Sequence, residues 1–218
     1  MDELRFDAGA ERLDALLLRP DGARLLYVLA HGAGADMRHS FLQRIAEALA
    51  ERHVATFRFQ FPYTQARRRR PDDAAVLRSA VRAAVNAASA AAPDLPIIAG
   101  GKSMGGRMTT QTQAEEPLPR VRGIALLGFP LHPARRPSTS RAEHLARVDL
   151  PMLFLQGTRD DLADLSLLRP IVSRLPRAEL RVIDGADHSF HVLRRSGRTD
   201  TEVFAELATA ITKWASAL

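Results

Sequence analysis

One serine lies in a pattern of residues that can turn a hydroxyl group into a nucleophile. Gly101, Ser103 and Gly105 form the pattern G-x-S-x-G, which follows the apolar, β-prone run Pro96–Ala99. In such a nucleophile elbow a strand turns sharply into a helix, and the serine Oγ stands clear of the backbone. Glycine flanks the serine because a side chain there would collide with the neighbouring strand or the incoming helix. The pattern alone is weak, since serine and glycine are common, so its meaning depends on partner residues.

A nucleophilic serine needs a histidine as base, and the histidine needs a carboxylate that orients it. In proteins with this elbow the three residues follow one another as serine, acid and histidine. We predict that His188 is the base, because it follows the last strand pattern and precedes the closing helix. His191 is the alternative, and His31 is interpreted as an orienting side chain at the entrance of its loop. The remaining histidines are interpreted as surface or packing residues: His39, His53, His132 and His144.

The predicted carboxylate is Asp160. It follows the strand pattern Met152–Gln156 and therefore lies at a carboxyl end, where ligands bind to parallel sheets. Asp161 is the close competitor, and Asp184 and Asp187 are further alternatives. The residue types alone leave this choice open.

A second loop with glycines follows the apolar run Leu25–Ala30. It reads His-Gly-Ala-Gly over residues 31–34. Glycines after a buried strand leave backbone N–H groups free to point at an anion, as an oxyanion hole requires. We expect a backbone N–H group of this loop to be one donor and the N–H of Met104, the residue after the serine, to be the other.

Nucleotide-binding motifs resemble parts of these loops but are incomplete. The dinucleotide pattern G-x-G-x-x-G would need glycine where Met37 stands, and a phosphate loop would need glycine where Pro96 stands.

The net charge is +6 and Arg67–Arg70 are four consecutive arginines, but abundant alanine and arginine indicate GC-rich, bacterial coding. We therefore expect no nucleic-acid partner. The absence of cysteine excludes disulfides, thiolate metal sites and a cysteine nucleophile, and we expect no cofactor or metal.

Strand patterns alternate with helical patterns along most of the chain. Strands are predicted at residues 4–6, 13–18, 25–30, 54–59, 96–99, 121–127, 152–156 and 179–183, the first two antiparallel. Helices are predicted near residues 41–49, with Ser40 as cap, and at 71–92, 104–115, 165–173 and 201–217. This alternation predicts one α/β domain over residues 1–218, with a mostly parallel sheet and helices on both faces. With neither a signal-peptide pattern nor a long apolar run, we expect a soluble, cytoplasmic protein without a membrane partner.

Four motifs in register resemble the α/β-hydrolase superfamily. They are HGAGADM (31–37), GGKSMGGR (100–107), QGTRD (156–160) and GADHSF (185–190). Their wording is similar to small bacterial hydrolases grouped with dienelactone hydrolases, and to the hydrolase-like region of a eukaryotic histone-acetyltransferase regulatory subunit. The resemblance covers nearly the whole chain and implies a single-domain α/β-hydrolase fold. Dienelactone hydrolases use a cysteine nucleophile, so Ser103 departs from them and a dienelactone substrate is not implied.

The resemblance implies a serine hydrolase of small ester or thioester substrates. Ser103 would attack the acyl carbonyl, His188 would accept its proton, Asp160 would orient the histidine, and an acyl-enzyme would form. The backbone N–H groups of Met104 and Ala33 would hold the oxyanion. Residues 129–150, where larger relatives insert a cap, contain three prolines and allow one short helix near residues 141–147. We therefore expect an open site without a sizeable cap, in a monomer or homodimer. The alternative function is a non-catalytic interaction module with a hydrolase fold.

Overall fold

The computed structural model describes residues 1–218, which are built around one eight-stranded sheet with the order β1-β2-β4-β3-β5-β6-β7-β8. β1 and β2 are antiparallel at one edge, and all pairs from β4 to β8 along the sheet are parallel. The predicted, mostly parallel sheet is therefore confirmed. The strands are β1 (Asp2–Ala8), β2 (Glu11–Leu18), β3 (Leu25–Ala30), β4 (Val54–Phe59), β5 (Ile97–Lys102), β6 (Val121–Leu127), β7 (Met152–Gly157) and β8 (Ala178–Ile183).

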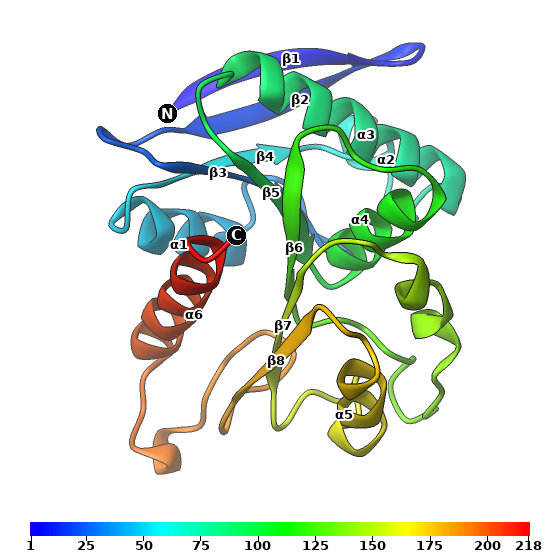
Figure 1. Cartoon of the computed structure of the whole chain (residues 1–218), viewed down its shortest axis with the longest axis vertical. Helices are drawn as coiled ribbons and strands as arrows, with labels where there is room; N and C mark the ends of the chain where they lie inside the picture. Colours follow the sequence, from blue (N-terminus) through cyan, green and yellow to red (C-terminus); the bar gives the residue numbers. More distant parts are fainter.

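Helices cover both faces of the sheet, as the alternation of patterns predicts. Figure 1 shows α1 and α6 on one side and α3, α4 and α5 on the other. Alternate residues of β3 explain the arrangement: Tyr27 and Leu29 pack with residues of α1 and α6, whereas Leu26 and Val28 pack with residues of α3 and α4. The helices are α1 (Ser40–Ala50), α2 (Pro62–Gln65), α3 (Ala74–Ala91), α4 (Met104–Glu115), η1 (Ser140–Arg147), α5 (Leu165–Ser173), η2 (Arg194–Ser196) and α6 (Asp200–Ala215).

Helix starts are where local prediction and structure differ. The cap of α1 is His39, not Ser40: the His39 ring accepts a hydrogen bond from the N–H of Phe41 at 3.2 Å, and Ser40 is already helical. α3 begins at Ala74 instead of residue 71, because the preceding residue still has an extended ψ of 152°. In both cases the helix is predicted correctly and only its first residue differs. Contacts with neighbouring residues determine which residue first has a helical ψ.

The segment between β6 and β7 holds one short helix, η1, as predicted for residues 141–147. It packs beside α4, where the Thr110 hydroxyl lies 2.8 Å from Nε2 of His144. The segment contains no further helix or strand, so the carboxyl ends of the strands carry no cap domain. None of the helices combines the length and apolar character needed to cross a membrane.

Candidate active site

Ser103 is the single residue between β5 and α4. Its backbone has φ 51° and ψ −117°, a left-handed region that residues with a side chain rarely adopt and that costs free energy. The neighbouring strand holds it there, because the Ser103 N–H donates to the carbonyl of Leu127 at 3.0 Å. The chain therefore forms the strained strand-to-helix turn that G-x-S-x-G predicts.

The flanking glycines have the steric role predicted for them. A Cβ added at Gly101 would lie 2.3 Å from the carbonyl oxygen of Ala30, and one added at Gly105 would lie 2.5 Å from the same oxygen. Backbone atoms cannot move aside as a flexible side chain can. The two glycines thus allow β3 to pass close beneath the turn.

A continuous chain of hydrogen bonds joins Ser103, His188 and Asp160. The Ser103 Oγ lies 2.9 Å from His188 Nε2, and His188 Nδ1 lies 2.7 Å from Asp160 Oδ2. Because a carboxylate only accepts, Nδ1 carries the proton that it donates to Asp160, which leaves Nε2 as an acceptor for the serine hydroxyl. The Asp160 side chain is 1% exposed and that of His188 is 21% exposed, so the histidine meets solvent and the acid does not.

Two further donors hold the buried Asp160 carboxylate. The Gln156 side-chain amide donates to Oδ2, and the N–H of Leu162 donates to Oδ1 at 2.9 Å. With His188 this makes three hydrogen bonds that stabilise the charged form and fix its orientation. Gln156 opens the QGTRD motif, but no role is predicted for it or for Leu162, since neither a side-chain amide at a strand end nor a backbone N–H indicates its own partner.

The alternative acids and base lie outside this hydrogen-bonded chain. Asp161 is exposed, and Asp184 lies 3.4 Å from the Thr158 hydroxyl. Asp187 accepts hydrogen bonds from backbone N–H groups of its own loop, and His191 pairs with Asp200 at 3.0 Å. Among the four aspartates considered, only Asp160 reaches His188.

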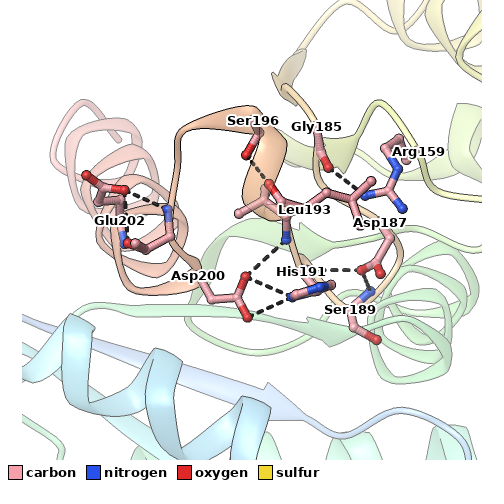
Figure 2. Close-up of polar contacts among 11 residues, drawn as sticks. Arg159, Gly185, Asp187, Ser189, His191, Leu193, Ser196, Asp200 and Glu202 are labelled. Atoms are coloured by element: carbon pink, nitrogen blue, oxygen red, sulfur yellow. Dashed lines mark hydrogen bonds and ion pairs between the residues drawn. The ribbon is translucent and has the colours of Figure 1, made fainter.

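The loop that carries His188 is tied down on both sides of this residue (Figure 2). Oδ1 of Asp187 accepts the N–H groups of Ser189 at 2.8 Å and His191 at 3.0 Å. Asp200, the first residue of α6, accepts the N–H of Val192 at 3.0 Å as well as the His191 ring. These contacts fix the loop backbone against α6 and thereby the position from which His188 reaches the serine.

His31 lies at the entrance of the glycine loop and is fully buried. Its Nε2 accepts the N–H of Phe61 at 3.3 Å, so the proton sits on Nδ1, which donates to the carbonyl of Gly32 at 2.9 Å. Burial lowers the pKa of His31 to about 4, mainly by desolvating the charged form. A neutral imidazole thus connects two loops, as expected of an orienting side chain.

The predicted oxyanion donors flank the serine. The N–H of Ala33 donates no hydrogen bond within the protein, and Ala33 lines the pocket beside Ser103. Met104 is the first residue of α4, where N–H groups have no partner in a preceding turn. Its side chain is buried among residues of the core, so only its backbone is available to a ligand.

Two adjoining pockets open at this edge of the sheet. The first has a volume of 440 Å³, contains Ser103 and His188, and has apolar walls from Phe41 and Phe204. The second has a volume of 710 Å³ and is lined by arginines from the predicted basic run, namely Arg67, Arg68 and Arg69. Both pockets share three lining residues: Gly34, Ala35 and His39. Part of the arginine run therefore lines a pocket that adjoins the one containing Ser103.

Solved structures with a similar fold match nearly the whole chain. A dienelactone hydrolase from Anabaena variabilis is 20% identical, with a TM-score of 0.77 over 98% of this chain and 95% of its own. An α/β serine hydrolase homologue from Coxiella burnetii is 20% identical, with a TM-score of 0.78 over 96% of each chain. A serine hydrolase without a lid from Xanthomonas campestris is 19% identical, with a TM-score of 0.76 over 98% of this chain and 94% of its own.

At sequence identities of about 20%, the similarity to these three structures shows a common fold. The sequence itself gives the family, because residues 23–216 match the family described as alpha/beta hydrolase domain. The match begins just before β3 and ends one residue beyond α6, so it includes the elbow and both loops that carry its partners. The chain therefore belongs to the α/β-hydrolase family and has the fold of a hydrolase.

Proposed function

We propose that this protein is a serine hydrolase of the carboxylesterase or thioesterase type, which cleaves small acyl esters through an acyl-enzyme. One observation carries the proposal: the hydrogen-bonded chain from Ser103 through His188 to the buried Asp160 opens into a pocket. A scaffold protein would need neither the strained serine nor its aligned partners. Similarity to hydrolases, including one described as lidless, supports the same conclusion.

Acylation follows from the positions of the groups. As the Ser103 oxygen bonds to the acyl carbon, His188 Nε2 accepts the hydroxyl proton and Asp160 stabilises the resulting imidazolium. The carbonyl oxygen becomes an oxyanion, which accepts hydrogen bonds from the N–H groups of Ala33 and Met104. When the tetrahedral intermediate collapses, the bond to the alcohol or thiol breaks, and His188 returns the proton to the leaving group.

Deacylation repeats these steps with water. His188 accepts a proton from a water molecule that attacks the acyl carbon, and the carboxylic acid leaves as Ser103 regains its proton. A pocket of 440 Å³ accommodates a small acyl group, and without a cap domain no surface is provided for a long lipid chain. The proposed substrates are therefore small esters or thioesters in solution.

The test is labelling of the wild-type protein by a fluorophosphonate at neutral pH, followed by mass spectrometry of the labelled peptide. Labelling of Ser103 that Ser103→Ala abolishes is the expected result. A series of p-nitrophenyl esters and acyl-CoA thioesters of increasing chain length then separates esterase from thioesterase activity. A folded wild-type protein that stays unlabelled would contradict the proposal and favour a non-catalytic interaction module.

A further inference from the structure

Lys102 is a buried amine beside the proposed catalytic residues that the mechanism above does not use. The chain has 31 basic residues but only two lysines, Lys102 and the exposed Lys213. Lys102 lines the same pocket as Ser103 and is half-buried as a residue, but its Nζ is shielded from solvent and has no hydrogen-bond partner. A buried amine without a partner is costly, so its presence calls for a physical reason.

The amine lies against the histidine and its acid. A Cβ built on Gly128 would lie 3.1 Å from Lys102 Nζ, 3.5 Å from Oδ2 of Asp160 and 3.5 Å from Cε1 of His188. Three groups therefore surround one point on the backbone. Nζ nevertheless forms no ion pair with Asp160, whose oxygens are already held by other donors.

Two aromatic rings also lie near the amine. Nζ lies 5.6 Å from the centre of the Phe41 ring and 5.8 Å from that of Phe190. Phe41 belongs to α1 and Phe190 to the loop that carries His188. Ring faces attract a cation but carry no charge that could neutralise it. The ammonium group therefore still acts electrostatically on the neighbouring groups.

The titratable groups that face Lys102 come from two loops. Asp160 follows β7, and Asp187 and His188 follow β8. Burial lowers the pKa of Lys102 to about 8, while Asp160 and Asp187 act in the opposite direction. The loop after β3 approaches the lysine stem at Gly32, where an added Cβ would lie 3.8 Å from Cγ of Lys102. On the side of α1, His39 and Arg44 line the same pocket.

We propose that Lys102 is a positioning residue whose ammonium group opposes protonation of His188 and thereby keeps the imidazole neutral, ready to act as a base. The ammonium attracts the Asp160 carboxylate and repels an imidazolium, so the neutral form of His188 is favoured while Lys102 is charged. This inference rests on the proposed hydrolase function for its consequences for catalysis. Its electrostatic part depends only on the positions of the three groups.

A second consequence concerns alkaline pH. When Lys102 loses its proton, near pH 8, the repulsion ends and the imidazolium of the transition state is no longer opposed. The rate should then rise a second time, above the rise that follows deprotonation of His188. We therefore expect the reaction rate of the wild-type protein to rise in two steps as the pH increases. A variant with a neutral side chain at position 102 should show only one rising step.

The experiment compares Lys102→Met with Lys213→Met, which removes the only other lysine from an exposed position on α6. NMR follows the His188 Hε1 resonance against pH, assigned by its loss in His188→Gln, and needs no substrate. For charges a few ångströms apart in a protein, removal of the ammonium should raise the midpoint by roughly 1 to 2 pH units. Fluorophosphonate labelling rates over the same pH range should lose the alkaline step. Lys213→Met should leave both measurements unchanged.

Two more variants separate charge from packing. Lys102→Arg keeps the charge and should retain the wild-type midpoint, whereas the neutral Lys102→Gln should follow Lys102→Met. If the midpoints of the neutral variants coincide with that of wild type in folded protein, the inference is overturned. If wild type is never labelled, the proposed function fails, and the NMR midpoint still decides whether Lys102 acts on His188.

Discussion

Asp160→Asn exchanges one carboxylate oxygen for an NH2 group at a site where every neighbour is a donor. Oδ2 accepts from His188 and Gln156, and Oδ1 accepts from the N–H of Leu162. If the new NH2 faced Leu162, two donors would meet. If it takes the position of Oδ2, a rotation of the Gln156 amide relieves the conflict, because Oε1 of Gln156 is buried and has no partner. We expect this second arrangement.

The exchange then reverses the direction of the hydrogen bond to His188. Nδ1 must accept from the new amide, so the proton moves to Nε2, which faces the Ser103 hydroxyl as a donor and cannot take its proton. The loss expected for a wrongly protonated histidine is about 10⁴ in kcat, or about 5 kcal/mol of transition-state stabilisation. Since the Gln156 amide can compensate, the free energy of unfolding should fall by no more than about 2 kcal/mol.

Steady-state hydrolysis of a p-nitrophenyl ester measures the loss, and urea denaturation checks the folding of the variant. Asp161→Asn is the matched control, because Asp161 is the exposed neighbour in sequence, and its kcat should stay within about twofold of wild type. A kcat for Asp160→Asn within tenfold of wild type would refute the role assigned to the carboxylate. An equal loss in both variants would point to disturbance of the loop.

Two further predictions concern stability. Gly105→Ala places a Cβ 2.5 Å from the backbone oxygen of Ala30, so we expect a loss of several kcal/mol or failure to fold, measured by thermal denaturation. Gly32→Ala is its control, since no atom lies closer than 3.5 Å to its added Cβ, and similar melting temperatures for both variants would count against the packing argument. Burial lowers the pKa of His31 and of His144 to about 4, so the unfolded chain binds their protons first as the pH falls. The free energy of unfolding should therefore be highest above about pH 6.5 and fall towards pH 4 by up to about 3 kcal/mol for each histidine, and a flat urea series from pH 7.5 to pH 4.5 would contradict this.

Much of the fold follows from local patterns in the sequence. All eight strands lie at the segments that the sequence predicts, and β3 and β7, which are buried along their whole length, coincide with continuous apolar runs. Ser103, Asp160 and His188 could be selected because each follows a predicted strand, and carboxyl ends of parallel strands meet at one edge. The role of the glycines around Ser103 could be predicted because it depends only on steric contacts at the turn itself.

Tertiary structure alone decided the remaining features, because they depend on contacts between residues far apart in the chain. The insertion of β4 between β2 and β3 depends on pairing energies that no single segment contains. Asp160 and Asp161 are adjacent in sequence, and only the packing of the β7 and β8 loops turns one towards His188 and the other to solvent. The same packing buries the Lys102 amine between two phenylalanine rings and the histidine, although a lysine beside a serine reads as an ordinary polar residue.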